Sequence, residues 1–305
     1  MAHYFSMLQK IRYFQPNQNS KRIEVHFGKD FYLHAIVQGI GTLWMNFNFN
    51  IYSFMKNMEV PVLMYHQFVS EVDKNSKIKT FITARHFELQ LKILKMLGYT
   101  TTTFRDLQKI GLENRFKKKY IILTVDDGYS NNYEYMFPLL SKYNMKAVIY
   151  LVTGLDHNRW DMANHGEQKL PMMSKAHVKE LIKSELIEIG SHTITHANLP
   201  TVSHEDQVQE IAGSKEFLEK TYGIKVTSFA YPYGQLNEAV KEVVKDAGYT
   251  SAVSANSGTG KFEDDLFEIR RSGINKDGII SFLVKISQPY TSYKGTQWKK
   301  QFVRL

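Results

Sequence analysis

Two histidines in the stretch SHTITH, at positions 192 and 196, are spaced so that they could clamp a metal ion. His192 and His196 follow an apolar run, LIEIG, which predicts a buried strand. Alone, the pair is explained equally well as two polar residues of an ordinary loop. It gains chemical meaning when a carboxylate joins it, because two imidazoles and one carboxylate form a three-ligand metal site that leaves positions open for water and substrate. A suitable carboxylate must therefore come from elsewhere in the chain.

Asp126 and Asp127 end a second apolar run, YIILTVDDG. Asp-Asp-Gly is common in turns, where short acids bind backbone N–H groups, so alone it indicates only a turn. Beside two histidines the pair has two chemical roles: one carboxylate can complete the metal site, and the other can accept the proton of an attacking water. Zinc suits such a ligand set, although non-haem iron uses the same ligand types.

Strand and helix patterns alternate from residue 59 onward, which predicts a parallel sheet covered by helices. The predicted strands are 60–66, 120–128, 146–154, 186–192, 226–234 and 250–255, and the predicted helices are 87–98, 133–143, 174–184, 204–223 and 237–248. In such sheets the working residues lie at the carboxyl ends of the strands. We therefore expect His66, the two aspartates, the two histidines and the segment YPYG (231–234) to face one mouth.

The composition is that of a globular protein, with 43% apolar and 23% charged residues among 305. The absence of cysteine excludes a disulfide scaffold, a thiolate nucleophile and a cysteine-ligated zinc site. The formal net charge is +9, and its densest cluster is RFKKKY at 115–120. No basic helix or aromatic RNA-binding motif accompanies this charge, so we expect no nucleic-acid partner.

Residues 1–57 form an N-terminal extension whose structure the pattern does not define. The range 31–55 has no formally charged residue and is long enough to span a membrane, but His34, Gln38 and three asparagines interrupt it. No cleavage site typical of a signal peptide follows. We expect a cytoplasmic protein; the alternative is a chain anchored through 31–55 with its catalytic domain outside the membrane. Residues 291–305 form a basic C-terminal tail.

Three segments in order, LTVDDGYSNNY (123–133), IEIGSHTITHANL (187–199) and AYPYG (230–234), resemble the motifs of the polysaccharide deacetylases. This is carbohydrate esterase family 4, the NodB-homology domain, and the motifs are closest in style to its poly-N-acetylglucosamine deacetylase subgroup. The resemblance places the domain at 58–290 and implies a distorted (β/α) barrel, an α/β fold. It also implies a divalent metal, with zinc favoured, and a polysaccharide substrate from whose N-acetylhexosamine residues acetate is released.

Matched position by position, the resemblance implies that Asp127, His192 and His196 bind the metal and that Asp126 is the general base. The backbone N–H of Tyr233 would help to hold the oxyanion of the tetrahedral intermediate, a contact that is typically worth roughly 10²–10³-fold in rate.

The chain departs from the family pattern at two places. Ala230 stands where many members carry an arginine that tethers the base; Arg271 could orient Asp126 instead, or could be a surface arginine beside Arg270. Many members also have a late histidine as general acid, but no histidine follows His204. His66 resembles the histidine that opens the domain in the exopolysaccharide-deacetylase subgroup and is our candidate acid, the alternative being a hydrogen-bonded strand-end residue.

Four further residues are predicted to contact substrate. Trp160 and Asp161 lie in a predicted loop, 155–171, where an aromatic ring could stack on a sugar or simply pack the loop down. Tyr231 and Pro232 belong to the third motif. Two other functions stay open: an O-acetyl esterase acting on xylan-like glycans, and a carbohydrate-binding protein of the same fold that lacks turnover.

Overall fold

In the computed structural model the chain forms two compact units, Met1–Met58 and Glu59–Leu305. The structure describes the backbone of residues 10–17, 20–26, 32–38 and 42–46. With side chains it describes residues 59–71, 80–115, 117–255, 258, 262, 264–275, 278–287 and 290–291.

The first unit is a four-stranded antiparallel sheet whose strands follow one another in chain order. They are β1 (Lys10–Asn17), β2 (Ser20–His26), β3 (Tyr32–Gln38) and β4 (Thr42–Asn46). The candidate anchor at 31–55 therefore contains two strands. Among the helices in the described ranges, none is long and apolar enough to cross a membrane.

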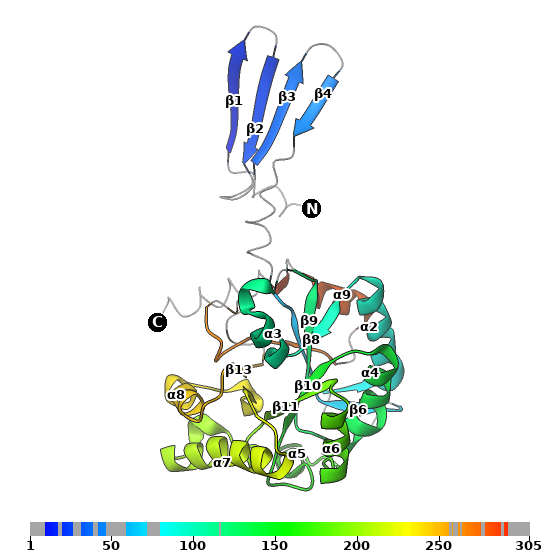
Figure 1. Ribbon diagram of the computed structural model, residues 1–305, viewed down its shortest axis with the longest axis vertical. Coiled ribbons are helices and arrows are strands. Elements are labelled where there is room, and N and C mark those ends of the chain that lie inside the picture. Colours follow the sequence, from blue (N-terminus) through cyan, green and yellow to red (C-terminus); the bar gives the residue numbers. More distant parts are fainter. Residues whose placement is uncertain are drawn as a thin grey trace. The chain divides into compact units, whose positions relative to one another are not determined.

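The second unit is built on an eight-stranded sheet in which every strand pair is parallel (Figure 1). Its order is β13-β12-β11-β10-β9-β5-β14, and β8 also pairs with β9. The strands are β5 (Val62–Tyr65), β8 (Thr100–Thr102), β9 (Tyr120–Val125), β10 (Ala147–Leu151), β11 (Ile187–Ser191), β12 (Ser228–Ala230), β13 (Ser251–Val253) and β14 (Ser272–Gly273). A separate parallel pair is formed by β6 (Gln67–Val69) and β7 (Phe81–Thr83), and β6 begins two residues after the end of β5.

Helices cover the outside of the curled sheet (Figure 1). They are α2 (Ala84–Met96), α3 (Phe104–Ile110), α4 (Phe137–Tyr143), α5 (Arg159–His165), α6 (Lys175–Lys183), α7 (His204–Tyr222), α8 (Glu238–Asp246) and α9 (Ile279–Lys285). Single turns of other helix types lie at Leu112–Asn114, Asn132–Met136, Leu199–Thr201 and Pro232–Gly234. Several helices begin at a capping side chain, as at Ser203, whose hydroxyl accepts the Asp206 N–H.

The strands bury both faces, as parallel strands between helices and a barrel interior must. In β9, Ile121 and Leu123 belong to the larger apolar cluster, whereas Ile122 belongs to the cluster that contains Tyr150. Gly190 in β11 lies against the Tyr150 ring, and a Cβ at this position would lie 2.4 Å from Tyr150 Cδ1. Glycine is therefore required directly before the segment that carries the two histidines.

Candidate active site

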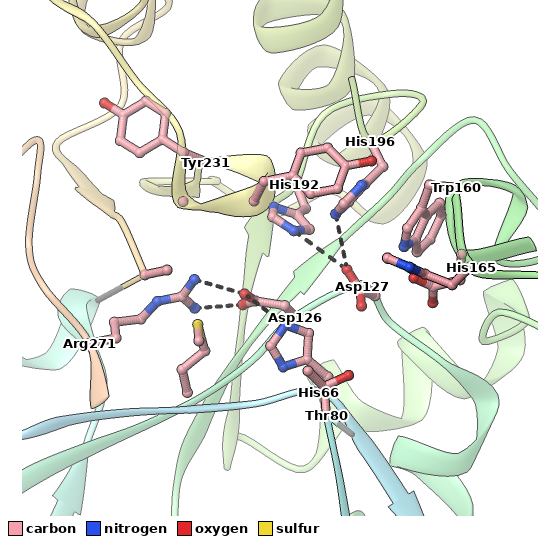
Figure 2. Close-up of a pocket in the computed structure, with 15 residues that line it drawn as sticks. His66, Thr80, Asp126, Asp127, Trp160, His165, His192, His196, Tyr231 and Arg271 are labelled. Atoms are coloured by element: carbon pink, nitrogen blue, oxygen red, sulfur yellow. Dashed lines mark hydrogen bonds and ion pairs between the residues drawn. The ribbon is translucent and has the colours of Figure 1, made fainter. Parts of the chain in front are cut away.

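The polar segments predicted to meet do so at the carboxyl ends of four strands (Figure 2). His66 follows β5, the aspartate pair follows β9, the histidine segment begins at the end of β11, and the YPYG turn follows β12. They border one pocket, lined by Met64, His66, Thr80, Asp126, Asp127, Trp160, Asp161, His165, His192, His196, Tyr231, Tyr233, Gly234, Ala255 and Arg271.

Asp127, His192 and His196 form a compact group whose candidate ligand atoms all lie within 4.8 Å of one another. The Nε2 atom of each histidine is 3.5 Å from Asp127 Oδ1 (Figure 2). Neighbouring ligands of a tetrahedral zinc ion would be about 3.3–3.4 Å apart, given bonds of about 2.0–2.1 Å. Asp127 Oδ1 is also a buried oxygen without a hydrogen-bond partner in the described ranges. These residues fit a divalent metal.

The two imidazoles differ in charge: although burial opposes it, the hydrogen bond and charge of Asp127 and the charge of Asp126 raise the pKa of His192, so metal binding there displaces a proton. Burial and the neighbouring His192 lower the pKa of His196 to about 3, which keeps its ring neutral and able to bind a metal. His192 Nδ1 lies 2.7 Å from the Ala230 carbonyl oxygen. Such a contact fixes the tautomer, because Nδ1–H donates to the carbonyl and leaves Nε2 free to act as a ligand.

The segment between the two histidines is held by Glu210, from α7. Its carboxylate accepts the backbone N–H groups of Ile194 and Thr195, each at 2.8 Å, and the Thr195 hydroxyl at 2.6 Å. Sequence reasoning missed this residue, because an acid on an amphipathic helix carries no signal that distinguishes an anchor from a solvated side chain.

The backbone at the site is strained. Asp127, Thr193, His196 and Tyr233 have φ values of 75°, 69°, 61° and 60°. The described ranges contain only two other non-glycine residues with positive φ. Such conformations persist where the surrounding structure enforces them, and they concentrate at functional sites.

Asp126 is paired with Arg271. The guanidinium donates from Nη1 to Oδ1 at 2.6 Å and from Nη2 to Oδ2 at 2.7 Å (Figure 2). Arg271 is only 2% exposed, and it also donates from Nε to the Ser254 carbonyl and from Nη1 to the Thr124 hydroxyl. Burial alone would raise the pKa of Asp126, but the charge and hydrogen bonds of Arg271 hold it well below its ordinary value. The carboxylate is therefore ionised.

His66 faces the same carboxylate, with Nε2 3.9 Å from Asp126 Oδ2. Its backbone carbonyl accepts the Asn132 side-chain amide at 2.6 Å. Asn132 is fully buried, so this bond ties the residue after β5 to the segment after β9. The sequence offered Asn132 only as part of a motif, without a role.

Residues 113–252 match the sequence model of the polysaccharide deacetylase family. The chain carries a polysaccharide deacetylase domain. The match contains both aspartates, both histidines and the YPYG turn, whereas His66 and Arg271 lie outside it.

Two relatives of the deacetylase domain are similar over most of it. A Bacillus subtilis protein assigned to the polysaccharide deacetylases is 27% identical over 218 residues, which span 71% of this chain and 71% of that protein. A poly-beta-1,6-N-acetyl-D-glucosamine N-deacetylase of Staphylococcus aureus is 26% identical over 192 residues, 60% of this chain and 64% of that protein.

Solved structures share the fold of the deacetylase domain. A Streptococcus pyogenes deacetylase in complex with acetate superposes with a TM-score of 0.64 at 24% identity, covering 75% of this chain and 97% of its own. A Bacillus cereus polysaccharide deacetylase superposes with a TM-score of 0.62 at 23% identity, covering 91% and 99%. The predicted distorted (β/α) barrel is confirmed.

One wall of the pocket is α5, which lies within the range 155–171 that the sequence predicted to be a loop. Trp160 stacks on the His196 ring with centroids 4.4 Å apart. Asp161 accepts the Tyr129 hydroxyl, and burial raises the pKa of Asp161 to about 6. Asn164 donates to the Tyr233 hydroxyl at 3.3 Å. Sequence reasoning assigned no role to Tyr129 or Asn164.

Of the residues in the third motif, some line the pocket and others lie in the core. Tyr231 borders the pocket, but its buried hydroxyl donates to the Phe267 carbonyl at 2.8 Å and its ring packs on Phe229. Pro232 is buried and is not among the pocket-lining residues. Tyr233 is 43% exposed, so it is the residue of this turn whose side chain is open to solvent at the pocket.

Proposed function

We propose that the protein hydrolyses the acetamido group of N-acetylhexosamine residues in a polysaccharide, with a bound divalent metal, for which Zn²⁺ fits best. The observation that supports this most is the juxtaposition of the buried Asp127–His192–His196 group with the Arg271-paired carboxylate of Asp126. The Staphylococcus aureus relative, named as an N-deacetylase of poly-beta-1,6-N-acetyl-D-glucosamine, points to the same substrate class, although this chain spans less than two thirds of that protein.

The chain's own residues supply binding and proton transfer. When bound, the metal would lower the pKa of a water molecule to about 7. Asp126 would act as the base and take up a proton at Oδ2, and Arg271 keeps the carboxylate ionised and oriented. His66, whose Nε2 faces the same oxygen, donates a proton to the departing nitrogen. The Tyr233 N–H stabilises the oxyanion. The products are acetate and a free amine.

The second acid favours an enzyme over a carbohydrate-binding protein. A binding site gains nothing from a buried, arginine-paired carboxylate beside a metal group, whereas hydrolysis requires a base there. An O-acetyl esterase would use the same machinery on an ester, so substrate comparison must separate the two.

The test is acetate release from N-acetylglucosamine oligomers and from acetylated xylan, with and without a chelator. We expect release from the oligomers, loss on chelation and recovery with Zn²⁺. Asp126→Asn should abolish release, and His66→Ala should leave a small remainder. Asp156→Asn is the matched control, because Asp156 is an acid outside the residues that line this pocket.

Three outcomes would count against parts of the proposal. Release from xylan alone would assign an esterase. Full activity of Asp126→Asn would remove the assigned base, and full activity of His66→Ala would assign proton donation to another group. A protein that binds glycan with no acetate release at any metal concentration would be a binding protein.

A further inference from the structure

The two histidines of the metal group are oriented by different means. His192 has a hydrogen-bond partner for its second ring nitrogen, the Ala230 carbonyl at 2.7 Å. His196 Nδ1 is buried and has no hydrogen-bond partner among the residues that the structure resolves with side chains. Metal-binding histidines almost always have such a partner, because it fixes the ring and its tautomer. Something else must therefore hold the His196 ring.

Aromatic packing surrounds that ring instead. The Trp160 indole stacks on one face, with centroids 4.4 Å apart and planes at 21°. The Tyr233 ring meets it edge-on at 4.6 Å and 74°. Both geometries are the favoured ones for aromatic pairs. The residue also needs support in its backbone, because its φ is +61°.

We propose that Trp160 is a positioning residue for the metal ligand His196. The stacked indole holds the His196 ring in place, as the Ala230 carbonyl holds the ring of His192. The inference rests on the proposed function only in taking His196 as a ligand. It assigns Trp160 to the metal site, and it takes the sugar-stacking role away from this residue.

The surroundings of Trp160 support this division of roles. Trp160 is only 8% exposed; His196 covers one face of its ring, and the Tyr129 ring lies at an angle of 52° to it with centroids 6.3 Å apart. Little indole surface is therefore left on which a sugar could stack. Tyr233 is 43% exposed at the same pocket and is the aromatic surface that a sugar can reach.

The helix that carries Trp160 is tied to the site at two further points. Asp161 accepts the hydroxyl of Tyr129, which lies two residues after Asp127, and Asn164 donates to the Tyr233 hydroxyl at 3.3 Å. Both ties lie after Trp160 in the sequence, and they fix the helix that holds the indole against His196.

The test measures Zn²⁺ affinity of the metal-free protein by competition with a chromogenic chelator. Trp160→Leu keeps apolar volume without a ring and should weaken Zn²⁺ binding about 10–100-fold, the usual effect of losing an outer-shell partner. Trp160→Phe keeps a stacking ring and should lose less than about threefold, a small part of one stacked pair. The Co²⁺ absorption spectrum should change for Trp160→Leu and stay like the parent's for Trp160→Phe.

A matched control exists in this chain. Tyr133 stacks on His177 with centroids 4.2 Å apart and planes at 4°, and neither residue lines the pocket. Tyr133→Leu removes an equivalent stack and should leave Zn²⁺ affinity and the Co²⁺ spectrum unchanged. Zn²⁺ affinity equal to the parent's in Trp160→Leu, or equal losses in both Trp160 variants, would overturn the inference.

A measurement on the unmutated protein covers the case in which Trp160→Leu does not fold. The stacked indole should shift the His196 ring protons upfield in the NMR spectrum of the metal-free protein, relative to those of His192. Absence of that shift would overturn the inference. If the parent binds no Zn²⁺, the proposed function fails; if it binds and Trp160→Leu binds equally well, only the role of Trp160 fails.

Discussion

Arg271 contacts both carboxylate oxygens of Asp126, although the two residues are 145 positions apart in the chain. The guanidinium is held in turn by the Ser254 carbonyl and the Thr124 hydroxyl. It also lies over the Tyr150 ring, with its central carbon 5.7 Å from the ring centroid. Ala230 carries no charge, so the cation beside Asp126 comes from near the end of the domain.

Arg271→Lys should lower kcat/KM by at least about 10²-fold, because a lysine cannot make the two-pronged contact that orients the carboxylate. Arg271→Gln should also destabilise the fold by about 3–5 kcal/mol, since it leaves a buried charge without its partner. Acetate release and chemical denaturation measure these effects. Arg270→Lys is the control, because Arg270 donates to the Thr291 carbonyl rather than to the site. If Arg271→Lys kept the activity of the parent, a positive charge beside Asp126 would be sufficient and the two-pronged contact would not be needed.

Glu210→Ala should weaken Zn²⁺ binding about tenfold or more, because it releases the segment that carries both histidines. The free energy of unfolding should fall by about 1–3 kcal/mol, as two N–H groups lose their acceptor. Calorimetric titration and denaturation report the two quantities separately. Glu216→Ala changes an exposed acid on the same helix and should alter neither. Unchanged affinity in Glu210→Ala would mean that the segment holds its shape without this anchor.

Asn132→Asp should reduce activity and destabilise the fold by about 1–3 kcal/mol, because a carboxylate oxygen replaces the amide that donates to the His66 carbonyl. We expect kcat to fall more than KM rises, since the affected group is the proposed acid. Asn114→Asp provides the comparison: its amide donates to the Ile110 carbonyl at 2.6 Å, but at an exposed position. Equal effects of the two substitutions would contradict a special role for the buried contact.

Asp161→Asn should change how stability depends on pH in the metal-free protein. Burial raises the pKa of Asp161 to about 6, so the folded state holds this proton more tightly than the unfolded chain does. The resulting stabilisation is full below about pH 4 and is lost as the pH rises through about 6. Because the side chain is partly exposed, we expect the parent to lose about 1–2 kcal/mol more than Asp161→Asn between pH 4 and pH 7. If denaturant titrations gave the parent and Asp161→Asn the same dependence of unfolding free energy on pH, the raised pKa of Asp161 would be refuted.

The sequence predicted those parts of the site that follow directly from short, local sequence patterns. The aspartate pair and the histidine pair each follow an apolar run, and parallel strands bring such ends together, so their meeting followed from the pattern. The pairing of Arg271 with Asp126 was one of two alternatives that the family resemblance left open, and the structure shows it; the pattern alone could not decide, because no periodicity distinguishes a buried arginine from its neighbour Arg270. Strands of two or three residues, such as β14, carry no alternation to detect. The helix α5 was not predicted, because its seven residues, RWDMANH, are too few to show the apolar periodicity that distinguishes a helix from a loop.

The pairing of β14 with β5 joins the two ends of the barrel domain, with Ser272 opposite Leu63 and Gly273 opposite Met64. A ribosome therefore produces the histidine pair and both aspartates well before the residue that orients the base. A nascent chain halted ahead of Arg271 would hold every ligand of the proposed metal site, yet it would have no aligned base. Pairings of such long sequence separation form late, because loop closure precedes any gain from the contact. The proposed hydrolysis would therefore depend on docking of β14 on β5, because Arg271 directly precedes β14.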